Sequence, residues 1–339
     1  MKMYNKIYYI KPRSLFPREL HSNTLFGAIC IGMRELYGEE VLEDMINSFR
    51  NEHPFVLSSA FPFAKKDKKK HHFFPKPIVE PEELSEEKDG NWIKEYYDSL
   101  KDYKKIKFMH EDIFYDFING KTNEKEIIKN LDKNSGKYKL INNKTVIIKA
   151  GNELDEKDFL ISIQDTPHNV LNRLSGESEN FYYSTGSYFK NSGLFFLINF
   201  LDESYKEKID AVLGFIEDRG FGGDLSTGSG QFEIENPDEE DFSRIDSIIN
   251  NKPDEANRFL ILSLYCPQAF DGFDKNNCWY DLKRIRGKFG CGLMKKPVFM
   301  FCEGSTFPEN NDMGKIVDVG DDTNKSVEYG LAYKIGMKK

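Results

Sequence analysis

The sequence has few cysteines, and none of them stands at metal-ligand spacing. Five occur among 339 residues, with no CxxC pair and no Cys/His cluster. Zinc sites built on cysteine need such spacing, so the sequence predicts no metal site and no cofactor. An odd, scattered set is typical of reduced thiols in a cytoplasmic protein. The five are Cys30, Cys266, Cys278, Cys291 and Cys302.

Long hydrophobic runs are also missing. The most apolar stretch, residues 193–201, is much shorter than the roughly 20 residues that a membrane-spanning helix needs. The N-terminus, MKMYNKIYYIKPRSLF, has no apolar stretch of signal-peptide length. We therefore expect a cytoplasmic protein.

A net positive charge is the third absence. Asp and Glu number 56 against 48 Lys and Arg, which gives a formal net charge of −8. Free-standing nucleic-acid binders usually carry a net basic field, so this balance argues against that class. It leaves open a subunit that has a local basic stripe and shares a nucleic acid with basic partners.

Aromatic residues, in contrast, are abundant. They make up 14% of the chain, with 28 Phe and 17 Tyr. Aromatic rings bury large areas in a core and also stack on bases, so the excess is compatible with a β-rich core or a nucleic-acid surface. The length favours two domains.

The first sixty residues predict an α+β unit. Residues 7–10 have the Ile and Tyr content of a strand. Apolar residues then recur at helical spacing over 25–37, behind the possible N-cap residues 21–24, and again over 41–49. Residues 55–59 return to a strand pattern. The order strand, helix, strand opens a ferredoxin-like or RRM-like unit.

Residues 64–165 differ from what precedes them, and we expect an insertion here. A basic run over 65–72 is followed by an acidic run over 82–89. Neighbouring runs of opposite charge usually indicate solvated loops. Apolar residues at helical spacing follow over 92–103 and 113–117, so the insertion is also expected to contain helices.

The rest of the chain is predicted to be mostly strands. Residues 181–188 and 194–201 are expected to be strands joined by a turn at 191–193, and 209–216 to be a helix. We place a domain boundary near residue 236, in an acidic stretch. Beyond it, strands are expected at 258–265, 279–286, 297–302, 315–319 and 328–335, with Arg284 and Arg286 on one face.

The segment 220–230, GFGGDLSTGSG, is rich in glycine. Such a loop exposes backbone N–H groups and lets a phosphate or another chain approach closely. It is not a P-loop, because Ser229 stands where the phosphate-binding Lys is needed. It is not a Rossmann fingerprint either, because a predicted helix precedes it and a strand follows it.

Several segments resemble one protein family in order along the chain. GGDLSTGSG resembles the glycine-rich loop of the RAMP superfamily of CRISPR proteins. The other segments resemble the subunit of the type III-A (Csm) CRISPR complex that caps the 5′ handle of the guide RNA. They are HSNTLFGAI (21–29), LSSAFP (57–62), PHNVLNR (167–173) with FYY (181–183), LSLYCP (262–267) and CEGS (302–305).

The resemblance implies two ferredoxin-like RAMP domains, residues 1–236 and 237–339. The first would hold the insertion (about 64–165) and a thumb hairpin (about 166–192). It also implies a non-catalytic subunit that binds crRNA, the large polymerase-like signalling subunit and the backbone RAMP subunit. The RNA-binding residues predicted are Ser22, Asn23, Thr24, His168, Asn169, Arg173, Gly222, Gly223, Ser226, Thr227, Gly228, Arg284 and Arg286. Tyr182 and Tyr183 are candidates for base stacking, although one of two successive strand residues should face a core.

Two other functions stay open. An RNA-cleaving RAMP protein would need a general acid or base, and His21, just before the first predicted helix, is the best candidate among six histidines. A lone histidine without a partner group is more often structural. A protein-only scaffold is the third possibility, and the acidic net charge favours it.

Overall fold

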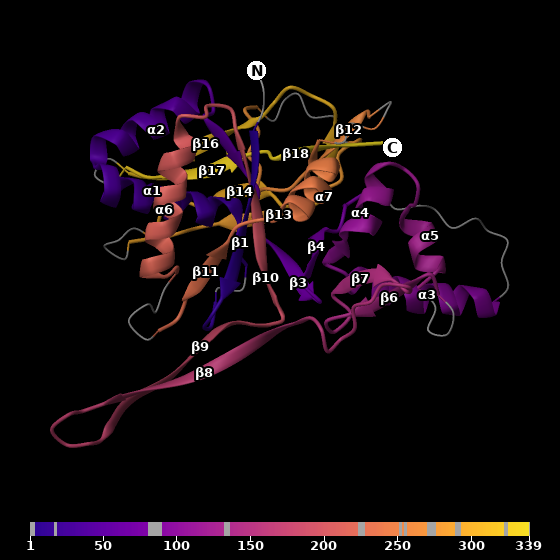
Figure 1. The fold of residues 1–339 in the computed structure, drawn as a ribbon, viewed down its shortest axis with the longest axis horizontal. Coiled ribbons are helices and arrows are strands. Elements are labelled where there is room, and N and C mark those ends of the chain that lie inside the picture. The colour runs from indigo at the N-terminus through magenta and orange to yellow at the C-terminus, as the bar shows by residue number, and fades with distance from the viewer. Residues whose placement is uncertain are drawn as a thin grey trace.

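The chain has a mixed α+β fold with one large sheet, a helical lobe and a long projecting ribbon (Figure 1). No helix in the part of the chain that is described is long and apolar enough to cross a membrane. The computed structural model describes residues 4–16, 19–80, 90–131, 136–222, 228–250, 253, 256–269, 276–288, 293–321 and 325–338.

Antiparallel strands form the centre of the large sheet, in the order β11-β1-β10-β3, with β2 also paired to β10. Successive side chains of β1 and β10 enter two different cores, so both central strands are apolar on both faces. Along the chain these elements follow the order β1-α1-α2-β2-β3, then β10-α6-β11 after the insertion and the ribbon, which agrees with the strand, helix, strand opening expected from the sequence. The strands are β1 (Tyr4–Pro12), β2 (Phe55–Leu57), β3 (Phe61–Lys66), β10 (Ser192–Phe200) and β11 (Phe232–Glu235).

Three helices pack on one side of this sheet: α1 (Ser22–Tyr37), α2 (Glu39–Asn51) and α6 (Tyr205–Arg219). Their apolar stripes meet Tyr8, Phe196 and other residues of β1 and β10. The helices α1 and α6 approach closely at Gly32, where an added Cβ would lie 2.6 Å from Val212 Cγ1. The helices expected over 25–37, 41–49 and 209–216 are therefore confirmed.

The sheet continues into the insertion through β4, β5, β7 and β6. The first of these strands, β4, pairs with β3 across the two-residue turn Asp67-Lys68, and both turn residues have positive φ. Three helices complete this lobe. The elements are β4 (Lys69–Pro75), α3 (Gly90–Lys105), β5 (Phe108–His110), α4 (Glu111–Ile118), α5 (Glu124–Lys129), β6 (Tyr138–Ile141) and β7 (Val146–Lys149).

The expectation of a solvated loop over the basic run 65–72 was wrong. The run forms a β3–β4 hairpin, and Lys70, His71 and His72 are buried with at most 5% of their surface exposed. Charge content alone suggested solvent exposure. The structure buries these residues because side chains from two other parts of the chain, α4 and α7 (Glu239–Ile249), pair with them.

The ribbon consists of β8 (Leu160–Leu171) and β9 (Ser178–Lys190), which pair along their whole length. It extends away from the rest of the molecule (Figure 1). The strands expected over 181–188 and 194–201 are confirmed as parts of β9 and β10, but they do not pair as a hairpin, because β9 pairs with β8 while β10 pairs with β1, β2 and β3. The predicted thumb, about 166–192, falls largely within this ribbon.

The segment after residue 236 forms helix α7 and three small sheets, β15-β12-β18, β13-β14 and β16-β17. Helix α7 was not expected, because the acidic stretch at its start was interpreted as a linker. Asp238 instead caps the helix by accepting a hydrogen bond from the Asp241 N–H. The strands are β12 (Arg258–Ile261), β13 (Leu282–Ile285), β14 (Val298–Phe301), β15 (Thr306–Pro308), β16 (Gly314–Asp318), β17 (Val327–Leu331) and β18 (Lys334–Met337).

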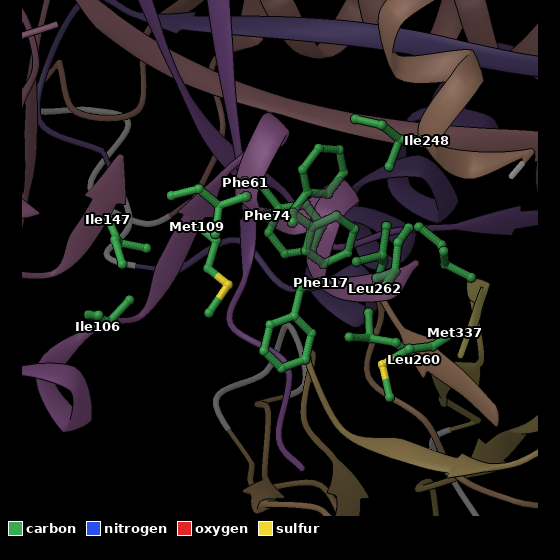
Figure 2. Close-up of a cluster of buried hydrophobic side chains, with 14 of the residues drawn as sticks. Phe61, Phe74, Ile106, Met109, Phe117, Ile147, Ile248, Leu260, Leu262 and Met337 are labelled. Carbon is green, nitrogen blue, oxygen red and sulfur yellow. The ribbon is translucent and has the colours of Figure 1, made fainter. Parts of the chain in front are cut away.

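The main core is shared between the regions on either side of residue 236. Figure 2 shows Leu260, Leu262 and Met337 from the C-terminal region close to Phe74 and Phe117 from the insertion. Burial of aromatic and aliphatic side chains, roughly 1.5–3 kcal/mol each, therefore couples the two regions. A boundary near residue 236 stays a prediction.

Candidate nucleic-acid interface

A groove of about 610 Å³ lies between the helices α1 and α6 and the C-terminal region. Residues 220–222, at the start of the glycine-rich loop, form part of its wall, and Gly287, Lys288 and residues 325–328 face them. Hereafter this is called the basic groove. Its cationic side chains are Arg34, Arg219, Lys288, Lys295 and Lys325.

Within the described residues, two of the five cations of the basic groove form ion pairs, Arg34 with Glu35 and Lys295 with Glu328. Glu328 is the one acidic residue among the described lining residues. It forms an ion pair with Lys295 at 3.1 Å and accepts a hydrogen bond from Asn23 Nδ2 at 3.0 Å. Arg219, Lys288 and Lys325 form no ion pair with a described residue. A chain of net charge −8 thus has a local positive field suited to phosphates.

The N-terminal end of α1 opens into this groove. Asn23 and Thr24 line it, and the cap residue His21 makes no side-chain hydrogen bond to the helix N–H groups. Helix N-termini attract anions because of their free N–H groups and the helix dipole. Ser22 behaves differently: it is fully buried, and its Oγ accepts a hydrogen bond from the Leu264 N–H. Its position supports a structural role and not RNA contact.

Two glycines that line the basic groove, Gly27 and Gly222, leave backbone without a side chain at its surface. Gly222 has φ 99°, a conformation that other residues rarely adopt. Gly27 lies inside α1, and an added Cβ there would meet nothing within 4 Å. A helix-interior glycine costs about 0.5–1 kcal/mol relative to alanine, and packing gives no reason for this one.

The remaining glycine-loop predictions are only partly described. Gly228 has φ 84° and does not line the basic groove. Gly223, Ser226 and Thr227 lie outside the described residues.

The two predicted arginines, Arg284 in β13 and Arg286 just after it, are exposed at the edge of this region. Arg286 donates from Nε to the carbonyl oxygen of Lys295 at 3.2 Å, and Lys288 follows two residues later. Arg286 therefore lies next to the basic groove. Arg284 pairs across the β13–β14 hairpin with Phe299 and does not line the groove.

The ribbon presents aromatic side chains on both faces. His168 stacks on Tyr182 with ring centroids 5.0 Å apart, and its Nε2 contacts Ser184 Oγ at 2.7 Å. On the opposite face Phe181 and Tyr183 meet edge to face at 5.1 Å. Both tyrosines are exposed, 43% and 61%. The expectation that one would face a core was wrong, because the two strands project beyond every core.

The other two ribbon predictions lie nearer its tip. Asn169 accepts a hydrogen bond from Ser178 Oγ at 2.6 Å, and Arg173 is exposed in the connecting turn. Exposed Leu174 and Leu171 accompany them. An isolated two-stranded ribbon is marginally stable in water, so this combination of exposed apolar and polar groups favours a bound partner.

The segment before α1 connects the ribbon to the glycine-rich loop. Phe16 and Ser187 exchange both backbone hydrogen bonds at the base of the ribbon. The Gly230 N–H donates to the Leu15 carbonyl oxygen at 2.8 Å. The ribbon base and the end of the glycine-rich loop are therefore held together, and the start of that loop lines the basic groove.

His21 lies near this interface but is not free to act as a base. Its Nδ1 is 2.8 Å from Glu303 Oε1, and its Nε2 is 3.1 Å from Glu19 Oε2 and 2.7 Å from Lys283 Nζ. Burial lowers the pKa of His21, but the hydrogen bonds to Glu19 and Glu303 outweigh it and raise the pKa to about 9. A protonated imidazole cannot accept a proton at neutral pH.

No family model matches the sequence. Two curated proteins do. The chain is 28% identical over 329 residues to the CRISPR system Cms protein Csm4 of Methanocaldococcus jannaschii, which covers 88% of this chain and 81% of that protein. It is 22% identical over 224 residues to Csm4 of Thermococcus onnurineus, covering 66% of this chain and 65% of that protein. The chain is thus similar to Csm4 proteins over most of its length.

Solved structures agree with the Csm4 fold along the whole chain. A chain of the Csm3-Csm4 subcomplex in the type III-A CRISPR-Cas interference complex aligns with TM-score 0.66 and 23% identity, covering 98% of this chain and all of that one. A chain of the Csm1-Csm4 cassette in complex with pppApA aligns with TM-score 0.59 and 18% identity, covering 99% and 98%.

Sequence reasoning found the helix end and the loop of the basic groove but missed its cations. Arg34 and Arg219 stand at the ends of α1 and α6, and Lys325 precedes β17. Nearly two hundred residues separate Arg34 from Arg219, so no local pattern marks them as neighbours. A basic residue near each predicted helix end was the only signal in the sequence.

Proposed function

We propose that this chain is the subunit of a type III-A CRISPR effector complex that binds the 5′ handle of the crRNA. The basic groove carries the proposal, because it combines three cations that form no ion pair with a described residue, a helix N-terminus and a glycine-lined wall at one place. Single-stranded RNA needs phosphate contacts together with stacking surfaces. The exposed aromatics of the ribbon supply the second requirement.

In this proposal each part of the interface has one task. Arg219, Lys288 and Lys325 hold phosphates, and Asn23 and Thr24 contact the chain beside them. The ribbon inserts Tyr182 or Tyr183 against a base and separates it from its neighbour, while Arg173 at the tip contacts the backbone. Two ferredoxin-like RAMP domains, 1–236 and 237–339, would frame the groove.

The partners follow from the relatives. Related chains were solved together with Csm3 and with Csm1. We infer that this chain likewise joins a backbone RAMP subunit and a large polymerase-like subunit in the cytoplasm. The acidic net charge suits a subunit that shares RNA with such partners.

The proposed role is non-catalytic. An RNA-cleaving RAMP protein would need a free general base near the groove, and His21 is held between Glu303, Glu19 and Lys283 with a raised pKa. A protein-only scaffold would have no use for unpaired cations in a groove. Purifying the complex and analysing its RNA distinguishes both alternatives from the proposal.

The experiment is to co-express the chain with its neighbouring subunits, purify the complex through a tag on this chain, and sequence the RNA that copurifies. We expect RNA of defined length classes with one repeat-derived 5′ end. In the Arg219→Ala/Lys288→Ala variant, RNA retention should fall about tenfold or more, because each charged hydrogen bond contributes roughly 1.5–3 kcal/mol. The slope of log K for RNA binding against log[salt] should become less negative by about 0.7 for each phosphate that the variant no longer neutralises.

The matched control is Lys101→Ala/Lys157→Ala, which removes two exposed lysines that do not line the groove. Equal RNA loss in the control would show that the loss depends on the net charge of the chain and not on the basic groove. Unchanged RNA in the groove variant would refute the role of the groove. Protein complex without RNA supports the scaffold, and RNA that the purified chain cuts supports the nuclease.

A further inference from the structure

A second cluster of titratable side chains lies outside the basic groove, where the insertion joins the large sheet. His71 lies on β4, His110 ends β5, and Glu111 begins α4. All three are buried, with exposed fractions of 4%, 2% and 5%. In the β4–β5 pairing His110 is opposite Phe73, so His71, two residues earlier, lies on the same face.

We propose that His71, His110 and Glu111 bind one divalent metal ion of the zinc class. His71 Nδ1 and His110 Nε2 are 3.2 Å apart. Two nitrogens at about 2.0–2.1 Å from one tetrahedral zinc would lie about 3.3 Å from each other. One ligand atom from each of the three residues, a ring nitrogen from each histidine and a carboxylate oxygen from Glu111, lies within 4.8 Å of the other two. Two imidazoles and one carboxylate are a known zinc ligand set.

The surroundings of the cluster supply the outer hydrogen bonds that metal ligands require. Metal-binding histidines usually donate their other N–H to a carboxylate, and metal-binding carboxylates are themselves hydrogen-bonded. His110 Nδ1 lies 3.4 Å from Asp112 Oδ2 and accepts a hydrogen bond from the Asp112 N–H at 3.3 Å. With an ion on Nε2, Nδ1 would instead carry the proton and donate it to that carboxylate. Glu111 Oε2 accepts from His72 Nδ1 at 2.7 Å. His72 Nε2 in turn is 2.7 Å from Tyr9 Oη.

Hydrogen bonding within the protein accounts for this cluster less well. If His71 Nδ1 donates to His110 Nε2, His71 Nε2 becomes an acceptor, and it has no hydrogen-bond partner among the described residues. Asn152 Nδ2 also points at His110 Nε2, at 3.3 Å. In this tautomer two donors compete for one lone pair. In the opposite one His110 Nε2 donates to His71 Nδ1, and the His71 Nε2 N–H has no acceptor among the described residues. An ion between the two nitrogens removes that conflict and leaves the Asn152 amide to hold a metal-bound water.

The nearby positive charges of Lys70 and Arg244 are partly offset by the Asp241 carboxylate that both contact. Lys70 pairs with Asp241 at 2.8 Å, and Arg244 pairs with Asp241 at 2.8 Å and with Glu111 at 3.6 Å. The ion would join β4 of the large sheet to the β5–α4 junction of the insertion. Its role is then structural. No pattern in the sequence indicates the site, because its ligands come from two segments 39 residues apart with no cysteine.

The test begins with the full chain, stripped of metal by a chelator and then titrated with Zn²⁺ and with Co²⁺. We expect one ion per chain, the strong visible absorption of four-coordinate Co²⁺, and a higher midpoint of thermal unfolding with Zn²⁺. His71→Ala and His110→Ala should weaken binding by about 100-fold or more, and Asp112→Asn should weaken it about 10- to 100-fold, as outer-shell changes do.

His53→Ala is the matched control, because it removes a histidine whose Nδ1 is bonded to the Phe49 carbonyl oxygen at the end of α2. It should bind as the parent does. No bound ion in the parent, or equal binding in the His71 and His110 variants, would overturn the proposal. If those variants do not fold, X-ray absorption of the zinc-loaded parent decides: two imidazole ligands support the site, and fewer refute it.

Discussion

Two regions of this chain gather cationic side chains and differ in how they balance them. In the basic groove Arg219, Lys288 and Lys325 have no ion-pair partner among the described residues. In the buried charge cluster, defined as Lys70, Asp241, Arg244 and Glu111, the side chains of Lys70 and Asp241 are only 6% and 2% exposed. Each cation there has a carboxylate partner.

Pairing and burial, not residue type, therefore separate binding charge from structural charge. Exposed cations repel one another weakly because water screens them, so a groove can keep them unpaired for a phosphate. A buried unpaired charge costs several kcal/mol. The buried charge cluster has to be complete, whereas the basic groove can await its ligand.

The largest expected effect is on the buried side of this comparison. Asp241→Ala leaves Lys70 and Arg244 without their shared partner, and we expect the free energy of unfolding to fall by about 3–5 kcal/mol. Urea denaturation of the purified chain measures it. The control is Asp98→Ala, which breaks the exposed pair with Lys101 and should cost at most about 1 kcal/mol. Equal decreases in the free energy of unfolding for Asp241→Ala and Asp98→Ala would show that buried and exposed ion pairs contribute equally in this chain.

An intermediate effect is expected at His21, where a partly buried charge depends on pH. Its pKa is raised to about 9 from an ordinary value near 6.5. The stabilisation is therefore fully present below about pH 6.5 and disappears as pH rises through 9, by an amount of order 1–3 kcal/mol. Urea midpoints at about pH 6, 7.5 and 9.5 should decline in the parent. In the His21→Gln variant the urea midpoint should change much less with pH, whereas the His53→Ala control should show the same decrease as the parent. A decrease in His21→Gln as large as in the parent would show that His21 does not cause it.

The smallest expected effect concerns Gly27, which lines the basic groove. Gly27→Ala should raise the free energy of unfolding by about 0.5–1 kcal/mol, because the new Cβ meets nothing and the helix gains propensity. The same methyl group narrows the basic groove, so RNA retention should fall a few-fold. Gly214→Ala, in α6 and also with an open Cβ position, should give the stability gain alone. If both variants retain RNA equally, Gly27 does not approach the ligand.

Local sequence patterns predicted most of the elements. Helical spacing identified α1, α2 and α6, because each of these helices buries one apolar stripe whose period is visible in the sequence. Strand composition identified β1 and β11. Pairing was harder. The turn signal at 191–193 was real, but β9 pairs with β8, since register and partner depend on which strand the sheet can accept.

Some residues of the candidate site were predictable from local sequence and others were not. Asn23, Thr24 and Gly222 were found from the sequence and lie together in the basic groove. Ser22 belongs to the same motif, but helix geometry turns it towards Leu264 and into the core. The groove cations come from distant segments, and nothing local links them.

The order of amino acids was enough to predict the resemblance to a Csm subunit, the mixed α+β class and the helix and loop motifs that line the basic groove, because those depend on short-range periodicity and residue type. Folding, in contrast, settled which charges are buried and which are left open. A lysine or histidine in the run 65–72 looks the same in sequence whether or not Asp241 and Glu111 reach it. Long-range contact supplies the partner carboxylate that offsets the cost of burial, and that contact exists only in the folded chain.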